Sequence, residues 1–127
     1  MKQHGSYQLE LRDRTIIVRF TAAWNRETAE SMCRDFLELA QTLAAKPWAC
    51  LVDLRDWGLG GPEVMEPIFE VNHWCAANNQ QFEAVVCSKQ LQQFFIQQLH
   101  TALPNTESRF FETEAEALDW LNDKGFC

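Results

Sequence analysis

One stretch of the sequence, residues 48–63, restricts the fold more than any other. It reads WACLVDLRDWGLGGPE, in which an apolar run from Trp48 to Val52 ends at a carboxylate, Asp53, and a glycine-rich segment and a proline follow. We interpret residues 49–53 as a strand and residues 54–61 as a loop that leads into a helix. A strand that is apolar on both faces is typical of the centre of a parallel sheet, where sites form at the carboxyl ends of the strands.

Strand and helix patterns alternate along the rest of the chain. Apolar alternation predicts strands at residues 7–11, 15–20, 82–87 and 109–111, and the first two form an antiparallel hairpin whose first strand is a sheet edge. Helical spacing predicts helices that begin after Asn25, at Pro67, after Ser88 and, behind a capping box of Thr113 and Glu116, at Glu114. Residues 62–65 are expected to form only a short turn, because a proline deep inside a helix is costly.

The order of elements is therefore β-β-α-β-α-β-α-β-α, which predicts an α/β fold. We expect a single-domain, mixed, mostly parallel five-stranded sheet with an N-terminal antiparallel hairpin and four helices. The 127 residues suit one domain, residues 1–127, in which residues 1–6 are expected to be a flexible tail. No apolar run approaches the roughly 20 residues of a membrane span, and residues 1–10 show no signal-peptide pattern.

The formal net charge of −7 is distributed unevenly along the chain. Residues 56–127 hold 11 of the 18 acidic residues but only 3 of the 11 basic ones. This argues against a nucleic-acid groove, which needs clustered cations, and it permits a basic protein partner; an acidic surface that serves solubility alone is the alternative. The five cysteines show no C-x-x-C spacing, so we expect neither a metal site nor disulfides and predict a cytoplasmic location.

Taken in order, these elements resemble the SpoIIAA-like proteins, which have the STAS or anti-sigma-factor-antagonist fold. The resemblance is carried by the initial hairpin, the strand that ends in VDLRDW, the turn into a helix near Gly61, and the terminal segment FFETEAEALDWL. It covers nearly the whole chain in element order. It implies a small cytoplasmic domain of a kind generally used for protein interaction or ligand sensing, and no cofactor is expected.

One position departs from the pattern that the resemblance implies. In STAS switch proteins a phosphorylatable serine lies at the start of the helix that follows the third strand. Here the corresponding residues 61–64 read GPEV, and residues 43–87 contain no Ser or Thr. We therefore predict that this site is not regulated by phosphorylation, and that Glu63 supplies one fixed negative charge in place of a reversible one.

The carboxyl ends of the predicted strands should gather a rim of aromatic and charged side chains that can bind a protein partner or a small ligand. The predicted binding residues are Trp24, Asn25, Arg55, Asp56, Trp57, Glu63 and Lys89. The alternative is that Arg55 pairs with Asp53 or Asp56 and that the tryptophans cover loop backbone.

The third predicted helix lacks charge, since no Asp, Glu, Lys or Arg occurs between Lys89 and Glu107. We expect its inner side to hold Leu91, Phe94, Phe95 and Leu99 and its polar side to hold Gln90, Gln92, Gln93, Gln97 and Gln98. Because Phe94, Phe95 and Ile96 are consecutive, they cannot all face one core, and they are the predicted interface of a homodimer. A helix buried beside a neighbouring element is the alternative.

No residues are predicted to be catalytic. His73 and Cys75 could suggest a thiol enzyme, but two residues apart on a helix they point to different faces. The sequence and the resemblance therefore predict a non-enzymatic, SpoIIAA-like protein-interaction domain with a protein partner of unknown identity. A regulatory role is one form that this function could take. Two alternatives stay open: binding of a small apolar ligand or lipid at the strand-end rim, and an unrecognised enzyme.

Overall fold

A five-stranded sheet in the order β1-β2-β3-β4-β5 forms the centre of the molecule. The structure is a computed structural model that describes residues 3–127, except for the side chain of Leu91. The strands are β1 (Ser6–Arg12), β2 (Thr15–Trp24), β3 (Trp48–Gly60), β4 (Gln80–Val86) and β5 (Glu107–Phe111). β1 pairs with β2 antiparallel and all other pairs are parallel, so the predicted mixed α/β sheet, its hairpin and its β1 edge are confirmed.

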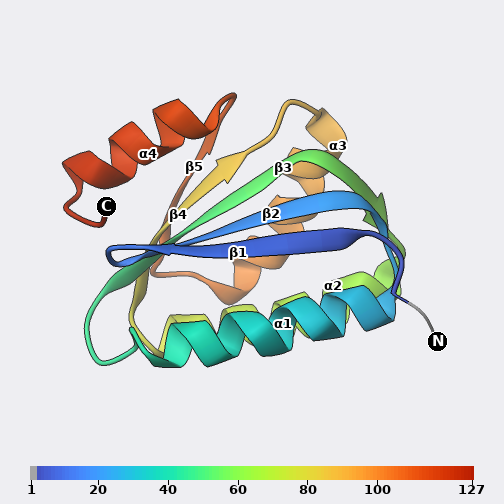
Figure 1. Cartoon of the computed structure of the whole chain (residues 1–127), viewed down its shortest axis with the longest axis horizontal. Helices are drawn as coiled ribbons and strands as arrows, with labels where there is room; N and C mark the ends of the chain where they lie inside the picture. The colour runs from blue at the N-terminus through green and yellow to red at the C-terminus, as the bar shows by residue number, and fades with distance from the viewer. Residues whose placement is uncertain (1–2) are drawn as a thin grey trace.

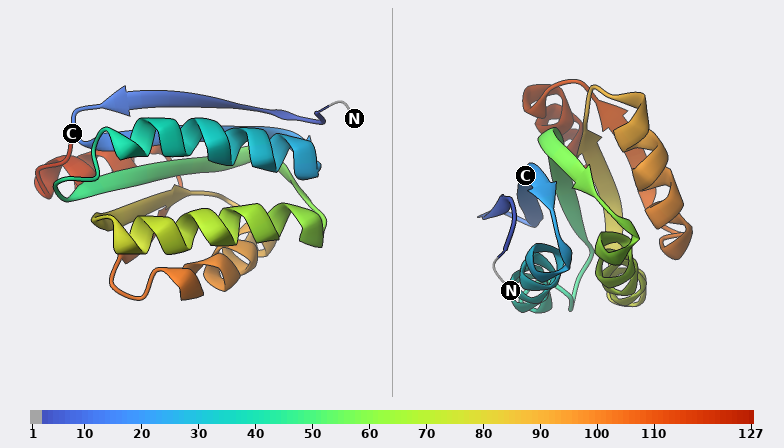
Figure 2. Two further views of the ribbon diagram at one scale, coloured as in Figure 1. Left: turned by 90° about the horizontal axis from the view of Figure 1, so that it is seen from below. Right: turned by 90° about the vertical axis from the view of Figure 1, so that its right-hand side faces the viewer.

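Helices cover both faces of this sheet. They are α1 (Arg26–Gln41), α2 (Pro62–Ala77), α3 (Gln90–Leu99), the short 3-10 helix η1 (His100–Ala102) and α4 (Glu114–Asp123). Figures 1 and 2 show α1, α2 and α3 on one face and α4 alone on the other, where it lies towards β4 and β5 and leaves β1 and β2 without a helix above them. The chain thus forms three layers with two separate apolar clusters, one on each side of the sheet.

Successive side chains of a strand point to opposite faces of the sheet, and this alternation decides which apolar cluster each residue joins. Ile16, Val18 and Phe20 of β2 point towards α1 and α2, whereas Ile17 between them packs with α4. Continuing this alternation places Arg19 on the α4 face, where it reaches the start of α4. A charged side chain on a central strand is therefore tolerated because it lies where the helix layer begins.

β2 and β3 are longer than predicted, because residues 21–24 and 54–60 continue the strands instead of forming loops. The two segments pair with each other up to Trp24 and Gly60, through two register shifts. Ala22 and Leu59 have positive φ angles of 62° and 67°, as irregular strand positions often do. The glycines and charged residues in these segments are typical of a loop in sequence. The segments form strands because each provides hydrogen-bond partners for the backbone of the other.

α2 is one continuous helix from Pro62 to Ala77, so the prediction of a short turn followed by a helix from Pro67 is wrong. Pro62 is the first helical residue, where its missing N–H removes no hydrogen bond. Pro67 lies inside the helix and is buried, and the helix continues past the one backbone bond that is lost there.

Local capping follows the predictions at two helix starts. Asn25 Oδ1 accepts a hydrogen bond from the Thr28 backbone N–H at 3.1 Å, and Thr113 Oγ1 accepts one from the Glu116 backbone N–H at 3.2 Å. In the predicted N-terminal tail, Ser6 begins β1 and the backbone N–H of His4 donates to Asn25 Oδ1 at 3.2 Å.

No helix in residues 3–127 has the length and apolarity that crossing a membrane requires.

Candidate functional site

The carboxyl ends of β2 and β3 bring together the starts of α1 and α2. Trp24 pairs with Gly60 at the end of the two strands, so the residues that follow, Asn25 and Gly61, are the N-cap residues of the two helices. Figure 1 shows both helix starts at this edge of the sheet. Arg26 and Glu66 form an ion pair of 3.4 Å that connects the two helices. The edge therefore contains two predicted binding residues, Asn25 and Glu63, on adjoining elements.

An acidic side chain, Glu63, lies in the first turn of α2. Gly61 offers no side chain to cap the helix, and the Glu63 carboxylate folds back into the space that a Cβ atom at position 61 would need. Glycine at this position thus makes room for the carboxylate beside the free amides of the first turn, where a negative charge is stabilised. Glu63 is exposed, so the same charge also faces solvent.

The two predicted rim tryptophans are part of the core, which corrects the idea of an aromatic rim. Trp24 is 4% exposed and Trp57 is 1% exposed. Phe20 stacks on Trp24 with 4.1 Å between ring centroids and meets Trp57 edge-on at 5.1 Å. The Trp24 indole N–H lies 3.1 Å from the carbonyl oxygen of Ser6, which ties the β1 edge to the cluster. These aromatic rings position the strand ends and offer no surface to a partner.

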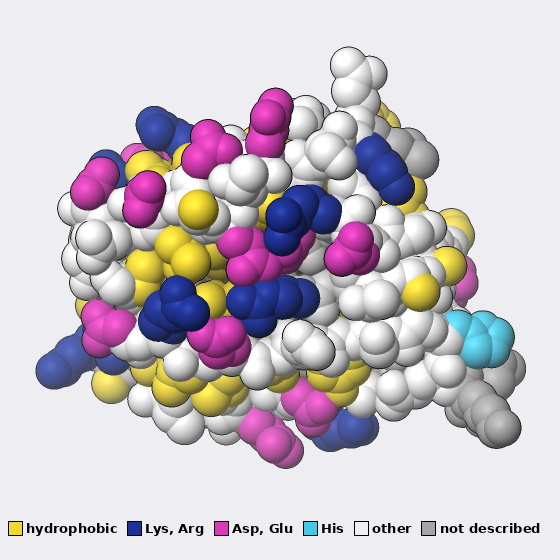
Figure 3. Space-filling view, turned by 45° about the horizontal axis from the view of Figure 1, so that its top comes forward, with side chains coloured by type: hydrophobic (Ala, Val, Ile, Leu, Met, Phe, Trp, Pro, Cys, Tyr) yellow, Lys and Arg dark blue, Asp and Glu magenta, His cyan; other side chains and the backbone are white. Residues whose placement is uncertain are grey.

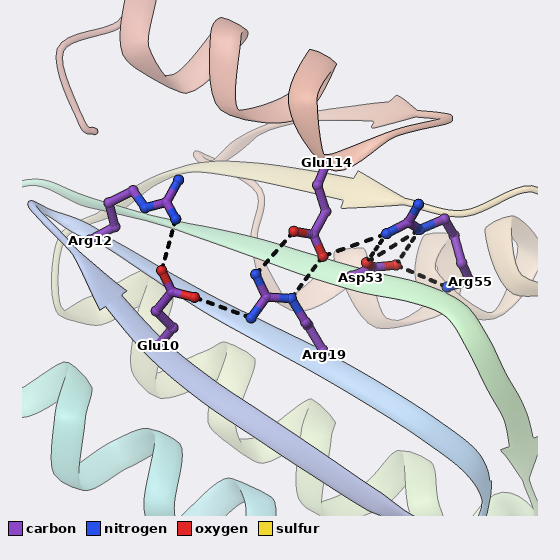
Figure 4. Close-up of polar contacts among 6 residues, drawn as sticks. All are labelled: Glu10, Arg12, Arg19, Asp53, Arg55 and Glu114. Atoms are coloured by element: carbon purple, nitrogen blue, oxygen red, sulfur yellow. Dashed lines mark hydrogen bonds and ion pairs between the residues drawn. The ribbon is translucent and has the colours of Figure 1, made fainter.

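Arg55 lies on the opposite side of the sheet and belongs to a chain of six charged residues on the α4 face. Its Nη2 is 2.7 Å from Asp53 Oδ2 and its Nε is 3.0 Å from Asp53 Oδ1, so the pairing that the sequence left as an alternative is confirmed. Figure 3 shows dark blue and magenta side chains interleaved at the centre of this face. Figure 4 shows how they connect in the order Arg12, Glu10, Arg19, Glu114, Arg55 and Asp53.

This chain of charges ties α4 to the sheet. Arg19 binds both carboxylate oxygens of Glu114, with distances of 2.8 and 3.0 Å, and Glu114 is the first residue of α4. Arg55 reaches the same carboxylate at 3.6 Å. A bidentate guanidinium–carboxylate pair combines charge with fixed geometry, so we assign these residues the role of positioning α4.

The pKa directions agree with this role. Hydrogen bonds from Arg19 and Arg12 lower the pKa of the Glu10 carboxyl, and the hydrogen bond to Glu114 raises the pKa of the Arg19 guanidinium. Burial by itself would raise the pKa of Asp53, but the hydrogen bonds from Arg55 help to outweigh burial and the pKa is lowered. The network therefore joins three basic and three acidic side chains in alternation.

The remaining predicted rim residues do not join one site. Asp56 is exposed on β3 opposite Thr21 of β2, and Lys89 is the exposed N-cap residue of α3, without a side-chain cap. The seven predicted residues thus separate into a helix-start group, a buried aromatic group, a network on the α4 face and two exposed positions.

The predicted oligomer residues on α3 have three different environments. Phe94 is 60% exposed, which corrects its expected place on the inner side, whereas Ile96 is 7% exposed and is part of the core. Phe95 is half-buried and meets Trp57 edge-on at 4.9 Å. Only Phe94 is therefore available on the surface, and the side chain of Leu91 lies outside the described residues.

Gln92 was predicted on the polar side of α3 but is fully buried. Its Nε2 donates to the carbonyl oxygens of Leu54 at 2.6 Å and of Trp57 at 3.0 Å. These carbonyls belong to the part of β3 that extends beyond its pairing with β4. The side-chain amide of Gln92 therefore supplies hydrogen bonds that a neighbouring strand would otherwise donate to β3. No local sequence signal could have distinguished Gln92 from the other glutamines of α3.

A second group that sequence reasoning missed lies beneath α1, α2 and α3. A cavity of about 50 Å³ there is lined mainly by apolar side chains, and Glu83 of β4 is among its polar ones. Glu83 is 7% exposed, and its Oε1 is 3.1 Å from His100 Nε2 of η1. The hydrogen bond to Glu83 raises the pKa of His100, which favours a protonated imidazole beside the buried carboxylate.

The cysteines have the properties of core residues. Burial raises the pKa of Cys33 to about 12, and it also raises the pKa of Cys50 and Cys75. His73 is exposed while Cys75 is buried, so the two face different ways as predicted. A nucleophilic thiol needs the opposite pKa shift. Within residues 3–127, no three His, Cys, Asp or Glu side chains form a group that could hold a metal ion.

Comparison with known proteins identifies the fold. A family model described as SpoIIAA-like matches residues 15–122. No curated protein matches the chain in sequence. Among solved structures, the chain is similar to an uncharacterised protein with a SpoIIAA-like fold from Shewanella loihica PV-4, with a TM-score of 0.75 and 17% identity over 95% of this chain and 98% of that chain.

Two further solved structures are named as anti-sigma factor antagonists. The first is SpoIIAA in its unphosphorylated form, with a TM-score of 0.70 and 12% identity over 92% of this chain and 98% of that chain. The second is from Mycobacterium paratuberculosis, with a TM-score of 0.65 and 14% identity over 94% of this chain and 96% of that chain. At these identities the similarity establishes the fold alone.

Proposed function

The chain belongs to the SpoIIAA-like family, and from this premise we propose that it is a non-enzymatic protein-interaction domain with a regulatory role. Two structures of the same fold are named as antagonists of anti-sigma factors, a name that describes action on another protein. The proposed binding surface is the carboxyl edge of β2 and β3, where Asn25 and Glu63 lie at adjoining helix starts.

A single observation carries the proposal: the carboxylate at the start of α2. A phosphorylation switch needs a hydroxyl at this position, so that the added dianion can meet the free amides of the first turn. Here Pro62 lacks an amide proton, and the Glu63 carboxylate already occupies the space over Gly61. The surface therefore holds one charge state permanently, and the partner is bound without control by phosphorylation at this site.

Charge variants at this position test the proposal. The tagged protein, the Glu63→Lys variant and a Glu38→Lys control are each used to enrich partners from the native host, followed by quantitative mass spectrometry. Glu38 is an exposed glutamate of α1, so its replacement makes the same charge change elsewhere. We expect at least one protein that is enriched with the parent and with Glu38→Lys but is lost with Glu63→Lys. If no protein shows this pattern, the helix-start surface is not the partner site.

Mass spectrometry of the protein isolated from the same cells tests the switch separately. Residues 43–87 contain no Ser or Thr, and we expect no phosphate there. Phosphate found on any residue of this segment would contradict the proposal of a permanently charged surface.

Binding of a small apolar ligand is a second candidate, because the sheet and α1, α2 and α3 enclose an apolar cavity. The cavity lies beneath these helices and away from the strand-end rim at which ligand binding was predicted. Its volume of about 50 Å³ is well below the roughly 150 Å³ of an engineered cavity that binds benzene. A lipid would enter only if a helix moved, which is why protein interaction is the better-supported function. Native mass spectrometry after gentle purification would detect a co-purified small molecule.

A further inference from the structure

An open groove with a volume of about 550 Å³ runs along α2 where the end of α3 and η1 pack beside it. Figure 2 shows α2 and α3 as neighbours on this side of the sheet. On the α2 side the half-buried Met65 and Phe69 stand one turn apart, and the exposed Glu66 and Glu70 form a parallel row beside them. The opposite wall is formed mainly by Gln98 and Leu99. The groove therefore has an apolar stripe and an acidic stripe along the same helix.

The charged side chains that line the groove, Glu66 and Glu70, have one sign. No Lys or Arg occurs in residues 56–88 or 90–108, which include both walls. Glu66 forms an ion pair with Arg26 of α1 at 3.4 Å, whereas Glu70 forms no ion pair within 4.0 Å among residues 3–127. The whole chain carries a formal net charge of −7. The groove therefore attracts cations and repels anionic surfaces.

α3 adds an apolar contact without adding charge. Phe94 is 60% exposed and lies one turn before Gln98, so both point to the same side of the helix. Gln98 lines the groove, so Phe94 lies one turn along α3 from the groove wall. An exposed aromatic ring is typical of the anchor positions of an interface, whose centre is depleted of charge. This explains an aromatic side chain that the fold itself leaves unburied.

We propose that this groove binds a basic amphipathic helix of a partner protein. Such a helix would place its apolar side on Met65 and Phe69 and its Lys or Arg residues opposite Glu66 and Glu70. Its end would reach Phe94, one turn along α3 from the groove wall. Pro62 to Glu70 extend about 12 Å along α2, which matches two turns of a bound helix. The inference rests on the proposed function, because the groove begins at Pro62, next to the helix-start surface.

Charge distinguishes this partner from the other candidates. An anionic membrane or a nucleic acid would meet like charge along α2. A second copy of the chain also carries a net charge of −7, which opposes association of two copies through an acidic groove.

Titration with designed peptides tests the groove. The probe is a labelled 18-residue helical peptide with a leucine stripe and a lysine stripe, measured by fluorescence anisotropy at about 0.15 M salt. The controls are the same peptide with glutamate in place of lysine and a scrambled peptide of identical composition. We expect only the first peptide to bind, with amide chemical-shift changes confined to α2, α3 and η1.

Two matched protein variants locate the binding. Glu66→Gln/Glu70→Gln removes the charges of the groove, and Glu30→Gln/Glu38→Gln makes the same change on the neighbouring α1. Loss of two exposed charge contacts should weaken binding about tenfold in the first variant and leave it within about twofold in the second. A third variant, Phe94→Ser, should also weaken binding while leaving the melting temperature unchanged, because its ring is exposed.

The outcomes separate this inference from the proposed function. No binding of the basic peptide, equal binding of the acidic peptide, or tighter binding to anionic lipid vesicles would overturn the groove assignment. Dimerisation that Glu66→Gln/Glu70→Gln abolishes would replace the partner helix with a second copy. A native partner that requires Glu63 but tolerates Glu66→Gln/Glu70→Gln would refute the groove and leave the proposed function standing.

Discussion

At the scale of single residues, buried polar side chains hold α3 and η1 against the sheet. Gln92 joins α3 to β3 by donating to the carbonyl oxygens of Leu54 and Trp57. Glu83 and His100 join β4 to η1 by an ion pair in which both side chains are largely buried. Both contacts combine residues that are distant in sequence, so the polarity pattern of one helix or strand could not have revealed them.

The Gln92→Leu variant tests the amide contact. Leucine fills similar space but leaves two buried carbonyl groups without their donor, which should lower the free energy of unfolding by about 1–3 kcal/mol. Gln97→Leu on the exposed side of the same helix is the control and should change stability by less than about 0.5 kcal/mol. Urea unfolding measures both, and an equal small effect in the two variants would show that Gln92 carries no such contact.

The Glu83–His100 pair predicts a stability that depends on pH. The pKa of His100 is raised above its ordinary value of 6.5, so its stabilising contribution is complete below about pH 6.5 and is lost as pH rises through the folded-state pKa. Deprotonation of His100 would remove the cation of this pair. The cysteines near this pair, Cys50 and Cys75, have raised pKa values and stay neutral over this range.

Unfolding measured at about pH 6 and pH 9 checks this dependence against the Glu83→Gln/His100→Gln variant, which has no titrating pair. The parent should lose more stability than the variant between the two values. Parallel curves for the two proteins would contradict an ion pair between these residues.

At the scale of elements, α4 is attached to the sheet by one aromatic anchor and one charged contact. Trp120 is 7% exposed and packs edge-on against Phe82, with ring centroids 5.5 Å apart. It also packs against Phe111 at 5.6 Å, with the two rings tilted by 45°. At its other end, Glu114 binds Arg19. The anchor lies on the buried side of α4, whereas the charged contact joins positions 95 residues apart and could be seen only in the folded structure.

The Trp120→Ala variant measures the aromatic anchor. Truncating a buried tryptophan costs about 3–5 kcal/mol, a large part of a total stability of roughly 5–15 kcal/mol. Asp119→Ala, which changes an exposed neighbour on the same helix, is the control and should cost less than about 0.5 kcal/mol. A melting temperature for Trp120→Ala within a degree or two of the parent would mean that α4 is not held by this side chain.

The errors in predicting elements share one physical cause. Residues 54–60 contain glycines and charges that favour a loop, yet β2 and β3 continue because each strand pairs with the other. Pro67 was expected to start a helix but lies within one, because packing of α2 against the sheet outweighs one lost backbone bond. Element order and type follow from local periodicity, while element ends depend on tertiary contacts.

At the scale of the whole molecule, the mixed sheet with α1, α2 and α3 on one side and α4 on the other could be predicted in class from the sequence. The candidate site could be predicted only in part. Asn25 and Glu63 share an edge because strand ends and helix starts are visible in sequence, whereas the burial of Trp24 and Trp57 depends on packing with Phe20 and was missed.

The proposed protein partner binds where α1 and α2 begin. Hydrogen exchange of the protein, alone and with the partner identified by enrichment, measures this directly along the whole chain. We expect added protection at the start of α1, along α2 and at the end of α3, and unchanged exchange in β1, β5 and α4. Protection confined to α4 or to the β1 and β5 edges, with α2 unchanged, would contradict binding at the two helix starts.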